Sequence, residues 1–265
     1  MMASLKSSPP AKDALAGRVV LVTGAHGGMG SAVAHAIAAS GGTPILLGRR
    51  VPKLNALCDA LERAGSNPAI YPMDLSGATP DDYDNLRQAV ESEFGRLDGI
   101  VHCAAEFKGL ASIENMPVED WLTGMHVNLT APLLLTRALL PLLRARDDAA
   151  VLFLLDAHDR VAKPFWGAYG VAKLGLAGMA EILHAELENS PVRVHGLIPG
   201  AMRTPLRARA YFAENPGDVP EPSAYAGAVA SLLAAGDATL DSQAIIELEA
   251  ESTAPKPFGL AVFAQ

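Results

Sequence analysis

The sequence predicts a single α/β domain in which a doubly wound parallel sheet carries helices on both faces. Short apolar runs alternate along the chain with longer segments of helical period. A glycine-rich turn joins the first apolar run to the first helix. The 265 residues are enough for one sizeable core, and no internal repeat interrupts the alternation. Because crossovers between parallel strands are right-handed, this order places helices on both sides of the sheet.

The first half of the chain supplies four of the expected strands and three helices. Apolar runs bounded by turn residues predict strands at 19–22, 43–47, 69–73 and 97–103. The helix over 31–39 is rich in alanine, and leucines recur at helical spacing in 51–64. Pro80 suits the first turn of a helix that continues over 83–94.

The second half continues the alternation and then breaks it. A strongly apolar helix over 131–143 and a long helix over 168–187 accompany strands at 149–155 and 192–198. Residues 199–223 are long and proline-rich without a clear period. Because this segment follows the carboxyl end of a strand, where such sheets bind ligands, we expect it to form a substrate lid.

Composition narrows the class of partner. The net charge of −8 argues against nucleic acid or an anionic membrane surface as a partner, and no apolar run approaches the roughly 20 residues that span a bilayer. Two cysteines without ligand spacing favour a reducing, cytoplasmic setting and give no sign of a metal site. We expect a disordered leader over 1–14, a dinucleotide-binding domain over 15–249 and a C-terminal tail over 250–265. The stretch from Glu247 is acidic and then proline-rich, and we expect it to pack loosely.

The glycine turn is the first candidate binding site. Glycines recur in the pattern G-x-x-x-G-x-G between a strand and a helix N-terminus. Backbone N–H groups converge at such a turn, and the missing side chains let a pyrophosphate approach closely. The residues expected there are Thr23, Gly24, His26, Gly28, Met29 and Gly30.

Five motifs, taken together and in order, resemble the short-chain dehydrogenase/reductase family over roughly residues 16 to 248. They are the glycine turn, Asp74 with Leu75 after the third strand, Asn128, the pair Tyr169 and Lys173 in Y-x-x-x-K, and Pro199-Gly200 with Thr204. The resemblance implies a Rossmann-type fold and a nucleotide cofactor held by these residues and by Ala104. The chain looks similar to a bacterial subgroup whose substrates are poorly defined.

The tyrosine and lysine carry the expected chemistry. Reduction of a carbonyl needs an acid for the oxygen, and a tyrosine of pKa ~10 is a weak acid–base group without help. A nearby ammonium lowers that pKa, and residues i and i+4 share one helix face. Read alone, Tyr169 is a half-buried aromatic and Lys173 a solvated charge. With the other motifs, the resemblance makes Tyr169 the acid–base and gives Asn128 the positioning of a relay water.

Asp156 departs from the family pattern. The family places a serine, which hydrogen-bonds the substrate oxygen, thirteen residues before the tyrosine, and that position is Asp156 here. An ionised carboxylate accepts hydrogen bonds and cannot donate to an oxyanion, and its charge disfavours a phenolate on Tyr169. Asp156 is therefore held protonated, or His158 or a substrate group replaces the donor, or carbonyl chemistry is crippled. A fourth reading makes Asp156 a loop residue that bonds nearby backbone N–H groups.

The end of the second strand indicates the cofactor. An acidic residue there would accept bonds from a ribose and repel a 2′-phosphate, whereas this chain has Arg49 and Arg50. A guanidinium fork suits a phosphate, so Arg49 favours NADP(H), with Arg50 the better candidate for a solvated strand end.

Two hypotheses follow. The first is an NADP(H)-dependent oxidoreductase that interconverts a carbonyl and an alcohol on a small organic substrate. The rival is a cofactor-binding sensor or scaffold with little turnover, which Asp156 favours. We also expect a homodimer or homotetramer, because the helices over 131–143 and 168–187 carry more apolar residues than one buried face needs.

Overall fold

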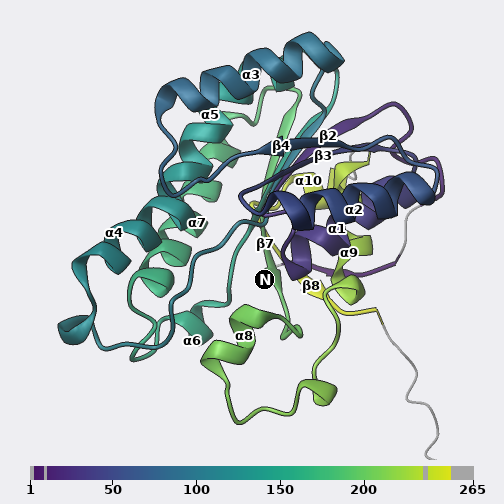
Figure 1. Ribbon diagram of the computed structural model, residues 1–265. Helices are drawn as coiled ribbons and strands as arrows, with labels where there is room; N and C mark the ends of the chain where they lie inside the picture. The colour runs from purple at the N-terminus through teal and green to yellow at the C-terminus, as the bar shows by residue number, and fades with distance from the viewer. Residues whose placement is uncertain (1–2, 9–10, 235–237, 252–265) are drawn as a thin grey trace, which may run out of the picture.

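Eight strands form one all-parallel sheet in the part of the chain that the computed structural model describes, residues 3–8, 11–234 and 238–251. The strand order is β1-β8-β7-β6-β5-β2-β3-β4 (Figure 1). The strands are β1 (Ala3–Lys6), β2 (Val19–Thr23), β3 (Thr43–Gly48), β4 (Ala69–Pro72), β5 (Gly99–His102), β6 (Ala149–Leu154), β7 (Val192–Pro199) and β8 (Ile245–Glu249). The predicted α/β class with a doubly wound parallel sheet is confirmed.

Helices cover both faces of this sheet (Figure 1). They are α1 (Gly28–Ala39), α2 (Val51–Arg63), α3 (Pro80–Phe94), α4 (Val118–Met125), α5 (Ala131–Arg144), α6 (His158–Val161), α7 (Gly167–Glu186), α8 (Pro205–Ala210), α9 (Ser223–Leu233) and α10 (Ala238–Asp241). Helices α1, α2 and α9 pack on one face, and α3, α5 and α7 pack on the other. Each predicted strand and helix is present, with its ends displaced by a turn or less.

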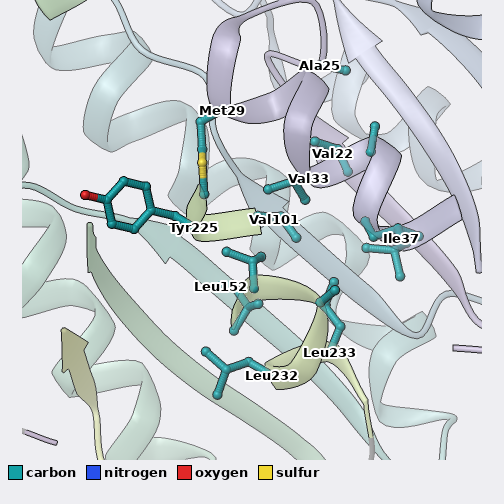
Figure 2. Close-up of a cluster of buried hydrophobic side chains, with 14 of the residues drawn as sticks. Val22, Ala25, Met29, Val33, Ile37, Val101, Leu152, Tyr225, Leu232 and Leu233 are labelled. Carbon is teal, nitrogen blue, oxygen red and sulfur yellow. The ribbon is translucent and has the colours of Figure 1, made fainter. Parts of the chain in front are cut away.

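Strand β2 shows why the sequence forms two cores. Val20 and Val22 belong to the core under α1 and α9, whereas Val19 and Leu21 point into the opposite core. Both faces of the strand are buried, so apolar residues follow one another without alternation. In Figure 2 Met29 of α1 lies beside Tyr225 of α9, and Val33 of α1 lies next to Val101 of β5.

The N-terminal segment corrects one expectation. The predicted disorder of residues 1–14 is wrong for β1, which pairs in parallel with β8 and places Ala3 opposite Ile246. The pairing continues when the Ser7 N–H donates to the Glu249 carbonyl at 3.0 Å. An edge strand of this kind is held by backbone hydrogen bonds, so its composition gives little sign of order.

The C-terminal segment corrects another. Glu247 and Glu249, which we expect at the start of a loosely packed tail, are the exposed positions of β8, and Ile246 and Leu248 between them are buried. Of the expected tail over 250–265, residues 252–265 lie outside the described part of the chain.

A long helical stretch runs from Val118 to Arg144, because a π-helical turn (His126–Thr130) joins α4 to α5. By length and composition alone this stretch could cross a membrane, so the expectation that no apolar run approaches the length of a bilayer span does not hold for it. It packs instead against α3, α7 and β6, as a core helix does. Length and composition are therefore weak evidence for a membrane span.

The order of the strands places the site. From β2 the chain moves outward to β3 and β4, then returns to β5 beside β2 and continues in the other direction. The loops after β2 and β5 therefore diverge at their carboxyl ends. In open parallel sheets, ligands bind in the crevice at this switch point.

Candidate active site

A cavity of about 340 Å³ lies at the carboxyl ends of the strands. Fifteen residues predicted for the site line it: Gly24, His26, Gly28, Met29, Gly30, Arg49, Asp74, Leu75, Ala104, Asp156, Tyr169, Lys173, Pro199, Gly200 and Thr204. Thr23 and Asn128 are buried beside it and are not among its lining residues.

The glycine turn forms one end of the cavity. Gly24 has φ +61°, and a Cβ there would lie 2.7 Å from the Ala104 Cα. A Cβ on Gly30 would collide with the Gly24 carbonyl, which curls back over the start of α1. Thr23 fixes the opposite wall, because its Oγ1 accepts a hydrogen bond from the Ala104 N–H at 3.1 Å. Only glycine therefore fits at these two positions, because backbone atoms occupy the space that a Cβ would need.

Arg49 follows β3 at the same end. Its Nη2 lies 3.2 Å from Glu106 Oε2, and its Nη1 lies 3.8 Å from Asp74 Oδ1. The Arg49 side chain is 42% exposed, and Arg50 and Lys53 line the cavity beside it. Three cations thus gather between the turn and the start of α2.

His26 sits under these cations. Its Nδ1 is buried without a hydrogen-bond partner among the described residues, and its ring occupies the space beside Gly48, where a Cβ would collide with it. Burial, followed by the charges of Arg50, Lys53 and Arg49, lowers the pKa of His26. His26 therefore offers the cavity a neutral polar edge.

Helix α7 brings Tyr169 and Lys173 into the cavity one turn apart. Lys173 is 3% exposed, and its Nζ donates to the Leu154 carbonyl at 2.6 Å and lies 5.7 Å from the centre of the Tyr169 ring. Burial lowers the pKa of Lys173 to about 8, with the negative charge of Asp156 acting against that shift. At neutral pH most Lys173 side chains therefore remain charged next to the tyrosine.

Asp156 lies at the end of β6, directly against the tyrosine. One carboxylate oxygen accepts a hydrogen bond from the Tyr169 hydroxyl at 3.1 Å. The other accepts from Arg160 Nη1 at 2.6 Å and from the Ala157 N–H at 2.9 Å. One oxygen of Asp156 thus binds its own loop, as expected of a loop residue, and the other contacts the candidate acid–base Tyr169.

These neighbours determine how readily Tyr169 ionises. Burial raises the pKa of Tyr169 well above its ordinary value, and the charge of Asp156 and its hydrogen bond raise it further. Arg160 acts in the opposite direction. The expected effect of Asp156 on the phenolate is confirmed in direction, and the tyrosine is a neutral hydrogen-bond donor in this arrangement.

Asn128 lies in the π-helical turn and holds the wall of the cavity. Its Nδ2 donates to the carbonyls of Glu106 and Gly124 at 2.8 Å each, and its Oδ1 accepts from the Glu106 N–H at 2.9 Å. The side chain is fully buried. Its amide is therefore occupied with backbone groups, and it fixes the segment that carries Glu106 and Phe107.

An aromatic cluster closes the side of the cavity next to Tyr169. The Phe107 ring centre lies 5.3 Å from that of Tyr169 and 5.4 Å from that of Trp166. Tyr211 packs on the other side of Trp166, at 6.2 Å. These rings make this part of the cavity apolar up to the tyrosine hydroxyl.

The segment over 199–223 contains α8 and contributes to the cavity from above the strand ends. Thr204 caps α8 by accepting the Arg207 N–H at 3.2 Å. Arg207 binds Glu214 through two hydrogen bonds of 2.6 and 2.7 Å, and Arg209 Nη1 donates to the Phe107 carbonyl at 2.7 Å. The segment is thus joined to the loop after β5 across the cavity.

Sequence reasoning misses several residues that line this cavity, among them Glu106, Phe107, Arg160 and Arg209. Arg160 had a local signal, because it lies four residues after Asp156 and such pairs meet on a helix. The contacts of Glu106 with Arg49 and of Phe107 with Arg209 join segments far apart in the chain. No spacing along the sequence indicates them.

Comparisons with known proteins agree with this geometry. The model of the short chain dehydrogenase family matches residues 18–215. The uncharacterized oxidoreductase YciK of Escherichia coli K12 is 34% identical over 215 residues, which cover 81% of this chain and 85% of that protein.

Two similar solved structures contain a cofactor. A short chain dehydrogenase structure from Shigella flexneri 2a in complex with NADP has a TM-score of 0.84 and 31% identity, and the match covers 89% of this chain and 98% of that one. A structure from Escherichia coli CFT073 in complex with NADPH has a TM-score of 0.84 and 32% identity, over 90% of this chain and 99% of that one.

Proposed function

The chain belongs to the short-chain dehydrogenase family of oxidoreductases, and from this we propose that it uses NADP(H) to interconvert a carbonyl and an alcohol on a small organic substrate. The observation that carries the proposal is the placement of Tyr169 and Lys173, one helical turn apart, in the cavity that the glycine turn and Arg49 also line.

The residues at the glycine turn fit a dinucleotide. Gly24 and Gly30 leave room for backbone groups to approach a pyrophosphate, and the N-terminus of α1 points a partial positive charge there. His26 lines the same end of the cavity, and its lowered pKa keeps the imidazole neutral there. When bound, NADPH would supply the hydride for carbonyl reduction.

Arg49 supports the choice of the phosphorylated cofactor. Its guanidinium carries five N–H donors, and its contacts with Glu106 and Asp74 leave part of the fork exposed to the cavity. Arg50 and Lys53 add positive charge, which would attract a 2′-phosphate. Two similar structures hold NADP or NADPH, which agrees with this choice.

In the proposed reaction Tyr169 acts as the acid. The hydroxyl is protonated at neutral pH and would give its proton to the substrate oxygen as the carbonyl is reduced, and its raised pKa makes this transfer harder. The charged Lys173 beside it stabilises the phenolate that the transfer leaves behind. In the reverse direction Tyr169 would take the proton from the alcohol.

The serine position of the family falls on Asp156 in this proposal. Because its carboxylate accepts the hydrogen bond of Tyr169, the proton points away from a substrate until the hydroxyl rotates. Arg160 offsets the charge of Asp156 and still has N–H groups to donate. We therefore infer an active but atypical site.

The same hydrogen bond favours the second candidate, a cofactor-binding sensor or scaffold with little turnover. Two measurements separate the candidates. Titration with NADPH tests cofactor binding, and NADPH consumption over a panel of aldehydes and ketones tests turnover. The enzyme consumes NADPH with at least one carbonyl, whereas the sensor binds NADPH and consumes it with none.

A further inference from the structure

Positive charge gathers in the cavity of a chain whose net charge is −8. Seven of the lining residues are basic, namely Arg49, Arg50, Lys53, Arg160, Lys173, Arg207 and Arg209, and three are acidic, namely Asp74, Glu106 and Asp156. An excess of cations in a cleft raises the local concentration of anionic ligands. Some of these cations have partners or proposed roles already, and any that has neither is available to a substrate.

Most of these cations already have a role or a partner. Arg49, Arg50 and Lys53 lie at the glycine-turn end, where the proposed cofactor phosphate would bind, and Lys173 serves Tyr169. Arg160 and Arg207 each hold a carboxylate at 2.6 Å, from Asp156 and Glu214. These six give no reason to expect an anion on the substrate itself.

Arg209 is different. Its one hydrogen bond goes to a neutral acceptor, the Phe107 carbonyl, and no carboxylate within the described residues lies in ion-pair range of its guanidinium. The planar group has five N–H donors, so most of them remain available to a ligand. Arg209 is thus a cation at the cavity whose charge the fold leaves uncompensated.

The position of Arg209 relates it to the reacting centre. It holds the backbone of Phe107, whose ring contacts Tyr169, with ring centres 5.3 Å apart. The rings of Phe107 and Trp166, which pack against Tyr169, line the same cavity as Arg209. A ligand that reaches both polar groups therefore also meets apolar rings, which favours an apolar body.

We propose that Arg209 binds a carboxylate on the substrate, so that the substrate class is a small keto acid, or the hydroxy acid formed from it, with an apolar body. This deepens the proposed function and depends on it. A guanidinium fork matches the two oxygens of a carboxylate, and Arg209 is an exposed residue at the edge of the cavity, where a carboxylate from solution can reach it. The oxidised carbon would lie at Tyr169 while the carboxylate lies at Arg209.

The test compares each of several short keto acids, bearing alkyl or phenyl substituents, with its methyl ester, in the full chain with NADPH. We expect the acid to have the higher kcat/KM. Arg209→Ala should raise KM for the acid by roughly 10- to 100-fold, the range expected for a lost hydrogen-bonded charge pair, and leave KM for the ester unchanged. Arg209→Lys should recover part of the loss, because it keeps the charge and loses the fork.

The matched control is Arg203→Ala in the same segment. Arg203 is 46% exposed, pairs with Glu221 at 2.9 Å and does not line the cavity. The Arg203→Ala variant should leave KM for the acid and KM for the ester unchanged. If Arg209→Ala impairs acid and ester equally, Arg209 only ties the segment to Phe107 and the inference is wrong. If it weakens NADPH binding instead, Arg209 serves the cofactor, and the inference is again wrong.

A binding measurement separates this inference from the proposed function. Calorimetry follows the binding of the keto acids, in turn, to the protein saturated with NADP⁺. If no carbonyl is reduced, the proposed function fails, yet an acid that binds the unmodified protein and not Arg209→Ala would still establish the carboxylate site. If no acid binds better than its ester, the inference fails whether or not turnover occurs.

Discussion

At the scale of single residues, the Tyr169 hydroxyl has one hydrogen-bond acceptor, and it is a carboxylate. Asp156 raises the pKa of the tyrosine further than burial does by itself, and Arg160 offsets only part of that effect. The same contact has two consequences for a reductase: the proton is held on Tyr169, and the place next to the substrate oxygen is occupied by an acceptor. Substitutions of Asp156 can therefore distinguish the effect of its charge on Tyr169 from the effect of the missing hydrogen-bond donor.

We predict that Asp156→Ser increases NADPH-dependent reduction of an activated carbonyl by at least ~10-fold. The serine hydroxyl supplies a neutral donor for the substrate oxygen, and removal of the carboxylate makes Tyr169 easier to ionise. A single oxyanion donor contributes on the order of 10²–10³ in rate in other enzymes, so ~10-fold is a modest share. Steady-state kinetics at fixed pH measures it.

Asp156→Ala is the matched control, because it removes the charge without supplying a donor. It should gain less than the serine variant, and NADPH affinity should hardly change in either. A fall in activity in both variants would show that Asp156, or the Arg160 that it holds, has its own catalytic role. Absence of turnover in all forms, with NADPH still bound, would favour the sensor.

We also predict that the unmodified protein binds NADPH more tightly than NADH and that Arg49→Asp shrinks or reverses the preference. The carboxylate would repel a 2′-phosphate and accept hydrogen bonds from a ribose hydroxyl. Fluorescence titration with both cofactors measures the ratio. Arg63→Asp, on the exposed end of α2, makes the same charge change away from the cavity and should leave the ratio unchanged. Equal or tighter binding of NADH to the unmodified protein would contradict the assignment.

The residues that sequence reasoning identified share a local signal, and among the ones that it missed Arg160 has one whereas Glu106, Phe107 and Arg209 do not. Tyr169 and Lys173 are one helical turn apart, and the glycines surround one turn, so spacing alone brings each group together. Glu106 reaches the site because Asn128, 22 residues later, binds its backbone on both sides. Such contacts exist only once the sheet has formed, so no pattern along the chain predicts them.

At the scale of elements, the turn between β2 and α1 depends on the absence of a side chain at Gly30. We predict that Gly30→Ala lowers the free energy of unfolding by about 1–3 kcal/mol, the usual cost of overpacking. The variant should also lose most of its NADPH affinity. The new Cβ must displace the Gly24 carbonyl, and the first turn of α1 moves with it. Denaturant unfolding and NADPH titration measure the two effects.

Gly77→Ala is the control for that substitution. A Cβ on Gly77 would meet no atom within 4 Å, and its φ is not in the left-handed region. We expect stability and NADPH binding close to those of the unmodified protein. If Gly30→Ala behaved in the same way, the close approach at the turn would not be needed for cofactor binding.

Three elements, α9, β8 and β1, are not predicted from the sequence, each for a different physical reason. Helix α9 is rich in alanine and other small or apolar residues and is buried over most of its surface, so it lacks the contrast between faces that marks an amphipathic helix. Strand β8 alternates, with Ile246 and Leu248 buried and Glu247 and Glu249 exposed, but it is only five residues long and its acidic residues are assigned to the tail. Strand β1 acquires its order only by pairing with β8.

At the scale of the whole molecule, two buried histidines link stability to pH. Burial lowers the pKa of His102 to about 3, with the charge of Lys173 adding to the effect, and burial lowers the pKa of His195 to about 4. Below pH 6.5 the unfolded chain therefore binds protons that the folded chain does not. The free energy of unfolding should fall as pH is lowered from 6.5, by about 1.4 kcal/mol per pH unit for each histidine.

Denaturant unfolding between pH 6.5 and 5 checks this slope, since carboxylates contribute more below that range. His102→Gln keeps a polar group near its partner, the Thr136 hydroxyl, and cannot titrate there. We expect the free energy of unfolding of this variant to fall less steeply with pH, by the equivalent of about one bound proton, whatever its absolute stability. Above pH 7 the variant and the unmodified protein should show the same pH dependence. An unchanged slope would mean that His102 is protonated in the folded chain.

The last prediction concerns assembly. Helices α4, α5 and α7 leave large apolar side chains exposed, among them Leu122, Leu133 and Ile182. Val171 and Ile182 on α7 are eleven residues apart, three turns, and so lie on one stripe. Helices α5 and α7 pack on the sheet with their other faces and α4 packs on α7, which leaves this outer surface without a partner in one chain. We propose that it is the contact between copies in a homodimer or homotetramer.

Light scattering at micromolar concentration should therefore give the mass of a dimer or tetramer, and Ile182→Glu should lower it toward that of one chain. A buried, unpaired carboxylate at the contact is costly, whereas on a free surface it is harmless. Phe212→Glu is the control, because Phe212 is 90% exposed in the segment over 199–223, away from these helices. It should leave the mass unchanged. A monomeric mass for the unmodified protein would refute the proposal, and an Ile182→Glu protein that kept its mass would place the contact on another surface.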